Sequence, residues 1–142
     1  MDALGRHIIL EMWGCCADII NNVDSVKEIL KEATKSIQAT LVDVVCHQFN
    51  PYGVTGVAIL AESHISVHTW PEYGYAAADI FICGGNIIHP QNAASFIIQA
   101  FHAKETSLVE FTRGDLSSKK VQDGKVMGIN GIVPDIRSPV CL

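Results

Sequence analysis

One segment in the middle of the chain gathers side chains that could do chemistry. Residues 61–72, with the sequence AESHISVHTWPE, combine acids, hydroxyls and imidazoles in a run that is typical of a β-strand. A second apolar run over residues 73–85 follows, and it places Cys83 beside two glycines. A purely structural strand rarely holds so many reactive groups. The two runs therefore indicate an active site built on paired strands.

Three motifs carry a resemblance to a known family. They are LGRH at residues 4–7, FNPYGVTG at residues 49–56 and ESHISVHTWPEYGYAAADIFIC at residues 62–83. In order and spacing these motifs resemble those of the prokaryotic S-adenosylmethionine decarboxylases, the self-processing pyruvoyl enzymes of polyamine synthesis. The resemblance extends over about the first 115 residues. Residues 114–142 contain no motif to match.

The resemblance implies that the chain makes its own prosthetic group by cleaving its backbone between Glu62 and Ser63. Ser63 Oγ attacks the Glu62 carbonyl, the amide becomes an ester, and β-elimination and hydrolysis leave a pyruvoyl group and release ammonia. Residues 1–62 become a beta chain and residues 63–142 an alpha chain. Such a group is needed because decarboxylation of an amino acid requires an electron sink, usually reached through an imine to a carbonyl. Neither a metal nor pyridoxal phosphate is expected.

The resemblance also implies roles for the residues at the family's catalytic positions. Ser63 is the precursor of the pyruvoyl group, which holds the substrate as a Schiff base, and His68 removes the Ser63 α-proton during processing. Cys83 returns a proton to the substrate α-carbon, although an isolated cysteine is more often a small buried hydrophobic residue. Thr55 stabilises the processing intermediate at a position where many relatives have serine.

Phe49 and Glu72 match the positions that bind the nucleoside of the substrate, S-adenosylmethionine. An aromatic face stacks on adenine, and a carboxylate accepts hydrogen bonds from the ribose hydroxyls and attracts the positive sulfonium. From the pattern alone, core packing explains Phe49 equally well. The product implied by the resemblance is S-adenosylmethioninamine, the aminopropyl donor for spermidine biosynthesis.

The spacing of Ser63 and His68 predicts how chains assemble. Five residues of extended chain span roughly 16 Å, and an odd offset places two side chains on opposite faces of a strand. We therefore expect His68 to act on the Ser63 of a twofold partner, in a homodimer with two shared active sites. Each site takes two residues from one protomer, Ser63 and Cys83, and four from the other, Phe49, Thr55, His68 and Glu72.

The remaining histidines and cysteines do not indicate a site. His64 and His68 would share a face of a helix, but this segment is strand-like and no third ligand stands at a convincing spacing, so a metal site is not expected. Five cysteines without a CxxC pair indicate reduced thiols rather than a disulfide framework or a zinc ribbon. No role is assigned to His7, His47, His89, His102, Cys15, Cys16, Cys46 or Cys141.

Periodicity and turn residues predict the elements that position these side chains. Apolar residues at spacings of three and four predict an amphipathic helix over residues 22–39, and a second helix is predicted over residues 89–103. The turn Pro71-Glu72-Tyr73-Gly74 predicts a β-hairpin around it. Strands are predicted at residues 7–13, 40–49, 54–60, 65–70, 76–83 and 107–112.

This order of elements predicts a single α+β domain over residues 1–142. The architecture is a two-layer sandwich of an antiparallel sheet with two helices on one face. Two helices cover only one side, yet residues 54–60 are apolar on both faces, so the second face is expected to pack in a homodimer. Residues 114–142 contain glycines and isolated apolar residues without a clear period, and we expect an irregular tail.

Composition limits the classes of function. The chain has 142 residues, of which 49% are hydrophobic and 18% charged, as in a folded globular domain. A net charge of −5 argues against binding to nucleic acid or anionic membranes, which attract basic surfaces. No apolar run approaches the ~18 residues that span a bilayer, and charged residues near the N-terminus argue against a signal peptide. A cytoplasmic protein is expected.

Three other functions stay open at this point. The same pyruvoyl chemistry could act on ornithine or arginine, although Phe49 and Glu72 suit a nucleoside better. The chain could be an unprocessed, non-catalytic ligand-binding module, against which the intact catalytic set argues. A serine hydrolase is disfavoured because no Gly-x-Ser-x-Gly elbow surrounds Ser63.

Overall fold

The computed structural model describes residues 3–84, 86, 87 and 89–116. The helices in this part of the chain are α1 (Ala17–Ile20), α2 (Val23–Ser36), α3 (Gln91–Ala100) and the short 3₁₀ helix η1 (Pro71–Tyr73). The strands are β1 (Ala3–Trp13), β2 (Leu41–Gln48), β3 (Val54–Leu60), β4 (Ser63–Trp70), β5 (Tyr75–Cys83) and β6 (Glu105–Asp115).

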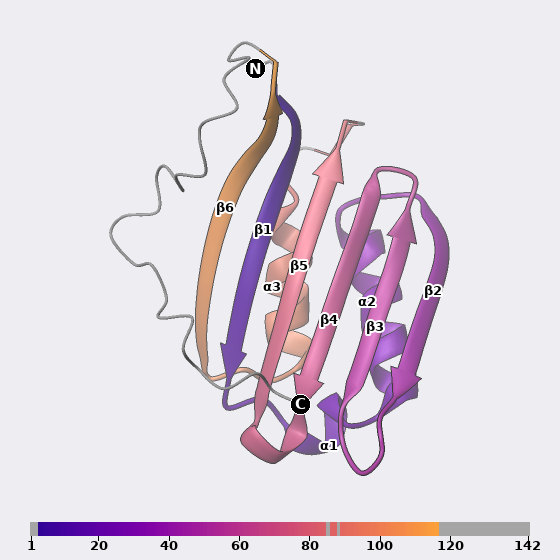
Figure 1. Cartoon of the computed structure of the whole chain (residues 1–142), viewed down its shortest axis with the longest axis vertical. Coiled ribbons are helices and arrows are strands. Elements are labelled where there is room, and N and C mark those ends of the chain that lie inside the picture. The colour runs from indigo at the N-terminus through magenta and orange to yellow at the C-terminus, as the bar shows by residue number, and fades with distance from the viewer. Residues whose placement is uncertain (1–2, 85, 88, 117–142) are drawn as a thin grey trace.

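The strands form one antiparallel sheet in the order β2-β3-β4-β5-β1-β6 (Figure 1). The predicted hairpin joins β4 to β5 through η1 and Gly74, whose φ of 60° is one that glycine adopts readily. This turn pairs Trp70 with Tyr75, and the same register continues along the hairpin to place Ser63 opposite Ile82. The hairpin therefore sets which residues of β5 lie beside the reactive segment.

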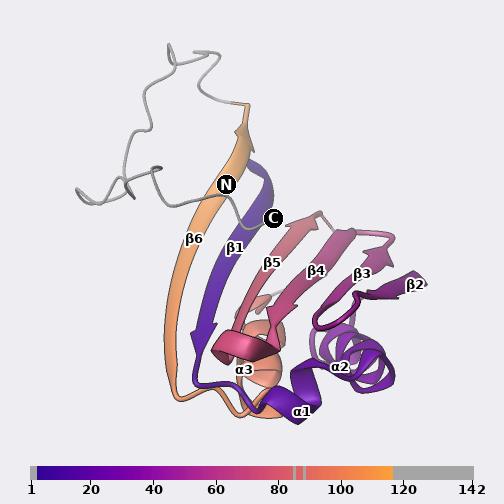
Figure 2. The ribbon, with the colours of Figure 1, turned by 60° about the horizontal axis from the view of Figure 1, so that its bottom comes forward.

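All three α-helices lie on one side of the sheet, as two views of the ribbon show (Figure 1, Figure 2). Asn22 caps α2 by accepting a hydrogen bond from the Ser25 N–H at 3.0 Å. On the buried face of α2, Val26 and Leu30 are fully buried. They lie over Gly56 of β3, where a Cβ would come within 2.8 Å of Leu30 Cδ1. Glycine at this position lets the helix approach the sheet closely.

The opposite side of the sheet, called here the open face, carries no helix in the described part of the chain. Because side chains alternate along a strand, β5 buries Ala78 and Ile80 under the helices and turns Asp79 toward the open face. The open face exposes several apolar side chains, among them Ile9 at 41%, Trp13 at 40%, Val45 at 56% and Ile59 at 43%.

The predicted two-layer architecture is confirmed, with differences in individual elements. Helix α1 has no counterpart among the predicted elements, because its four residues are too few to show a helical period. Strand β6 continues to Asp115, so the first two residues assigned to the irregular tail belong to a strand. The rest of the predicted tail, from residue 117 onward, lies outside the described residues. Among the described helices, none combines the length and the apolar character required to cross a membrane.

Candidate active site

Ser63 begins β4 directly after the tight turn that follows β3. Its φ of 136° lies in a region that residues other than glycine rarely adopt. A contact with the residue that precedes β2 fixes this turn: the Glu62 carboxylate accepts a hydrogen bond from the Thr40 N–H at 3.1 Å. Burial acts to raise the pKa of Glu62, but backbone hydrogen bonds, led by that of Thr40, outweigh burial and lower the pKa. The strained backbone thus lies at the bond predicted to break.

Cys83, at the end of β5, is brought beside Ser63 by the hairpin. Its N–H donates a 2.7 Å hydrogen bond to the carbonyl oxygen of Glu62, which belongs to the carbonyl group that Ser63 would attack. On its other side Cys83 pairs with Gly5 of β1, where a Cβ would come within 3.0 Å of Cys83 Sγ. Glycine there leaves room for the thiol. The structure therefore brings together the two residues that we assigned to one protomer.

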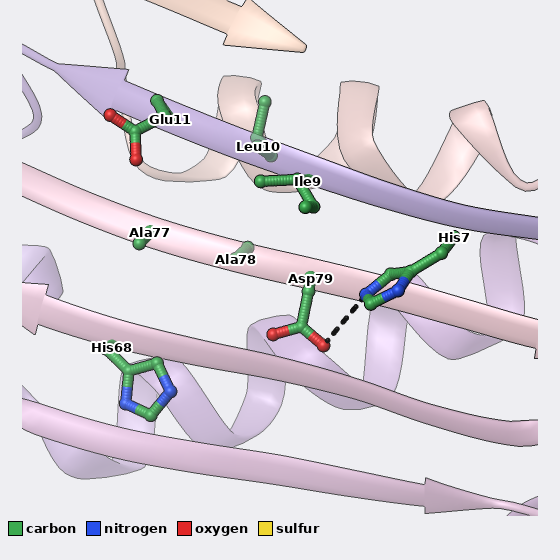
Figure 3. A pocket seen from close by; sticks show the side chains of 8 residues that line it. All are labelled: His7, Ile9, Leu10, Glu11, His68, Ala77, Ala78 and Asp79. Carbon is green, nitrogen blue, oxygen red and sulfur yellow. Dashed lines mark ion pairs between the residues drawn. The ribbon is translucent and has the colours of Figure 1, made fainter. Parts of the chain in front are cut away.

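His68 and Thr55 form a cross-strand pair on the open face. Thr55 Oγ1 lies 3.0 Å from His68 Nδ1. Beside them the small side chain of Ala77 on β5 leaves a hollow of about 240 Å³, which extends to Glu11 of β1. Figure 3 shows the His68 ring and the Glu11 carboxylate on either side of the strand that carries Ala77. His68 therefore faces an open space rather than the Ser63 of its own chain.

A larger cavity, of about 510 Å³, lies at the end of the sheet where β4 finishes and η1 begins. Phe49 is 47% exposed there, with its ring centre 4.7 Å from that of His47 in edge contact, so it is not a core residue. The volume is in the range of pockets that bind small molecules. The lining includes all four residues predicted to form the second half of a site: Phe49, Thr55, His68 and Glu72.

The two halves of the predicted site lie at opposite ends of β4. Ser63 starts the strand, Trp70 ends it, and Glu72 follows in η1. The seven steps along the strand span roughly 23 Å. Within one chain, the cavity around Phe49 is therefore too far from Ser63 for both to contact the same small substrate at its reacting carbon.

A run of hydrogen bonds to which we assigned no role leads from Ser63 across the open face. Ser63 Oγ lies 3.3 Å from His64 Nδ1, and His64 Nε2 lies 2.8 Å from Asp79 Oδ2. The other oxygen of Asp79 accepts a hydrogen bond from the Ser66 hydroxyl at 2.6 Å. His7 Nε2 approaches Asp79 Oδ2 at 3.5 Å (Figure 3). The hairpin turn is the sequence signal that could have found this cluster, because its register sets Ser66 opposite Asp79.

Asp79 is expected to make the stability of the fold depend on pH. Burial acts to raise its pKa, but hydrogen bonds from Ser66 and His64 and the charges of His64 and His7 outweigh burial and lower the pKa. A carboxyl group whose pKa is lowered by folding stabilises the fold above its unfolded pKa of about 3.9, and this contribution is lost as the pH falls through the folded pKa. Asp79→Asn should therefore lower the Tm at neutral pH.

The difference in Tm between the unmodified chain and Asp79→Asn should shrink below about pH 4. Thermal unfolding of both chains across a pH series measures it. Asp18→Asn, which changes an exposed carboxylate of α1, serves as the matched control. A Tm difference that stays constant down to acid pH would show that Asp79 acts through packing and not through its charge.

Comparison with known proteins identifies the family. The family model described as S-adenosylmethionine decarboxylase matches residues 6–114. An S-adenosylmethionine decarboxylase proenzyme of Thermodesulfovibrio yellowstonii is 48% identical over 119 residues, which cover 84% of this chain and 87% of that protein. A proenzyme of the same name from Methanococcus maripaludis is 42% identical over 123 residues, covering 87% of this chain and 100% of the relative.

A solved structure agrees with these relatives. The crystal structure of the adenosylmethionine decarboxylase from Aquifex aeolicus matches with a TM-score of 0.76 and 36% identity. The match covers 86% of this chain and 100% of that one. The matched family region, residues 6–114, includes Ser63, His68 and Cys83. The chain therefore belongs to the S-adenosylmethionine decarboxylase family.

Proposed function

We propose that this chain is a proenzyme that cleaves itself before Ser63 and then decarboxylates S-adenosylmethionine to S-adenosylmethioninamine, the aminopropyl donor for spermidine. The observation that carries the proposal is the geometry at the cleavage site. Ser63 has strained backbone, and the preceding carbonyl group is held by the Cys83 N–H. Membership of the family supports the chemistry, and its relatives are named proenzymes.

The first step of processing needs a nucleophile held beside a polarised carbonyl group. When Ser63 Oγ attacks the carbonyl carbon of Glu62, the carbonyl oxygen becomes an oxyanion. The Cys83 N–H, 2.7 Å from that oxygen, is placed to donate to the developing negative charge. Breaking the amide then relieves the backbone strain at Ser63. These two features favour an acyl shift from nitrogen to oxygen at this bond over its neighbours.

After processing, the pyruvoyl group at residue 63 supplies the carbonyl that takes up the electrons left by the departing carboxyl group. The Cys83 backbone contacts the carbonyl group that precedes residue 63, so its thiol is the nearby group that we expect to donate a proton to the substrate α-carbon. Gly5 keeps the space around that thiol open. We therefore assign the return of the proton to Cys83.

The cavity at the other end of β4 suits the nucleoside of the substrate. The exposed ring of Phe49 offers a stacking surface for adenine. The Glu72 carboxylate can accept hydrogen bonds from the ribose hydroxyls and attract the sulfonium. Ornithine or arginine, which have no nucleoside, would leave most of the roughly 510 Å³ unfilled. This observation favours S-adenosylmethionine over a basic amino acid.

A twofold partner packed on the open face would complete the site. A second sheet running in the opposite direction brings Ser63 of one protomer to the Phe49 cavity of the other. The same partner covers exposed apolar side chains of the open face, among them Ile9, Val45 and Ile59. A single twofold arrangement would both complete the active site and bury these apolar side chains. The proposal therefore includes a homodimer with two shared active sites.

Mixing two inactive variants should restore activity if the sites are shared. Ser63→Ala and His68→Ala chains each lack one half, but a mixed dimer holds one complete site. Random exchange should recover about a quarter of the original activity. Carbon dioxide release measures the recovery, and native mass spectrometry confirms the exchange. Ser63→Ala mixed with the double variant Ser63→Ala/His68→Ala is the control, because it can form no complete site. Confirmed mixed dimers without activity would rule out sharing.

Intact mass and substrate preference test the function as a whole. The purified chain should contain two polypeptides, residues 1–62 and residues 63–142, and the second should have no free N-terminal amine. It should release carbon dioxide from S-adenosylmethionine faster than from ornithine or arginine. An active preparation that consists of one continuous chain would contradict the pyruvoyl mechanism. A chain that stays uncleaved and inactive would favour a non-catalytic ligand-binding module.

A further inference from the structure

The attack of Ser63 on Glu62 needs a base, and His68 of the same chain is not placed to be one. Ser63 Oγ must lose its proton, because an alcohol is a weak nucleophile at its ordinary pKa. His68 lies five residues further along β4, where its ring contacts Thr55 and not Ser63. Among the described residues, the imidazole that contacts Ser63 Oγ is that of His64, whose Nδ1 lies 3.3 Å away.

Asp79 sets the tautomer of His64. An ionised carboxylate only accepts hydrogen bonds, so the 2.8 Å contact with Asp79 places the hydrogen of the neutral ring on His64 Nε2. His64 Nδ1 then has a free lone pair, and the Ser63 hydroxyl can donate to it. A carboxylate, an imidazole and a serine hydroxyl are thus connected by hydrogen bonds, as in serine hydrolases. Here Nδ1 faces the serine and Nε2 faces the carboxylate, the reverse of the arrangement in those enzymes.

The ionised form of Asp79 is stabilised by a hydrogen bond from Ser66 and by the nearby ring of His7, which makes no hydrogen bond to it. The Ser66 hydroxyl donates to one oxygen at 2.6 Å. Arg113 of β6 donates to His7 Nδ1 at 3.2 Å, so the hydrogen of a neutral His7 lies on Nε2, which is 3.5 Å from Asp79. An ionised Asp79 stabilises the imidazolium that forms when His64 accepts a proton.

We propose that His64 is the general base of self-cleavage and that Asp79 is its positioning residue; this inference rests on the self-processing proposed above. The Ser63 hydroxyl proton passes to His64 Nδ1 while the bond from Ser63 Oγ to the Glu62 carbonyl carbon forms. The same proton then passes to the Ser63 nitrogen as the amide C–N bond breaks. The products are an ester and a free amine, no atom is gained or lost, and His64 returns to its starting state.

The two histidines then serve successive steps. His64 acts on the hydroxyl of its own chain and forms the ester. His68, on the partner in the proposed dimer, acts on the Ser63 α-proton during elimination. In His68→Ala the ester should therefore form without being consumed by elimination. This difference separates the two steps in an experiment.

Hydroxylamine can trap the ester that His68→Ala accumulates. It attacks the ester carbonyl and releases residues 1–62 as a hydroxamate and residues 63–142 with an unmodified Ser63. Newly synthesised chain is sampled over time, each sample is trapped at one fixed pH, and intact mass gives the rate of the acyl shift. Asn130-Gly131 is another bond that hydroxylamine can cut, but it gives fragments of different mass.

Adding His64→Gln to His68→Ala should slow ester formation about 100-fold, a typical effect of losing a general base. Asp79→Asn should slow it too, and the two together should be no slower than His64→Gln alone, because they act as one unit. A structural role of Asp79 would instead add its own loss. His102→Asn is the matched control: it changes an exposed histidine with a φ of 55°, which asparagine also tolerates.

An unchanged rate of ester formation in folded His68→Ala/His64→Gln overturns the inference. Thermal unfolding shows whether each variant is folded. If His64→Gln does not fold, the rate of ester formation in His68→Ala/Asp79→Asn tests the inference instead. If the unmodified chain is never cleaved and His68→Ala gives no trapped ester, the proposed function itself fails, and this inference fails with it. Cleavage of the unmodified chain together with a rate independent of His64 removes the inference alone.

Discussion

Replacing Ser63 with alanine should leave the chain in one piece of 142 residues and abolish decarboxylation. Alanine has no oxygen with which to attack the Glu62 carbonyl, and it cannot become a pyruvoyl group. The expected loss is the entire activity, because the mechanism has no second electron sink. This one substitution should therefore remove both the cleavage and the chemistry that follows from it.

Intact mass spectrometry and carbon dioxide release from carboxyl-labelled S-adenosylmethionine measure the effect of Ser63→Ala. The matched control is Ser95→Ala, an exposed position of α3 where alanine favours the helix. This control should be cleaved and active like the unmodified chain. Turnover by homogeneous, uncleaved Ser63→Ala would show that the activity does not depend on a pyruvoyl group.

Replacing Cys83 with alanine should separate processing from catalysis. The hydrogen bond that holds the Glu62 carbonyl comes from the backbone of residue 83, so alanine keeps it and the chain should still be cleaved. The thiol that returns the proton is lost. We expect kcat to fall about 100-fold or more with little change in KM, since the effect falls on a proton transfer.

Steady-state kinetics of cleaved Cys83→Ala measure this loss, with Cys46→Ala as the matched control. Cys46 lies on the helix side of β2, and its Sγ is 3.0 Å from where a Cβ of Gly56 would stand. Burial raises the pKa of its thiol, an effect that outweighs the charge of Lys27, so Cys46 is expected to be an unreactive packing residue. An equal loss of kcat in both variants would mean that the Cys83 thiol has no special role.

The sequence predicts the elements best where a local signal marks their ends. Strand β3 has the predicted bounds, because turn residues precede it and a tight turn follows it. Helix α2 has a clear apolar period and an Asn22 cap, so its place is readable without tertiary information. Helix α1 has four residues and no side-chain cap, and packing at the start of α2 decides its existence.

Some features of the candidate site can likewise be predicted from a single strand, whereas others depend on how the strands pair. Alternation along one strand is enough to predict that Ser63 and His68 lie apart, and the cavity groups His68 with Thr55 rather than with Ser63. The contact between His64 and Asp79 is diagonal across two strands, so it depends on the register of the hairpin. No property of His64 by itself distinguishes it from an ordinary strand residue.

The strand order determines what cleavage does to the molecule. The segment before Ser63 contributes β1, β2 and β3, and the segment from Ser63 onward contributes β4, β5 and β6. In the sheet, β1 of the first fragment is inserted between β5 and β6 of the second, and β3 borders β4. The fragments are therefore interleaved, and they cannot separate without melting three ladders of hydrogen bonds.

Interleaving also changes the kinetic order of refolding. The intact precursor refolds each protomer as a single molecule, at a rate that does not depend on dilution. After the proposed cleavage the two fragments would have to associate before they refold. Refolding after complete denaturation would then be bimolecular, and its rate would decrease on dilution. The proposed cleavage would therefore make renaturation harder, and the cleaved protein would keep its activity only if it never unfolds completely.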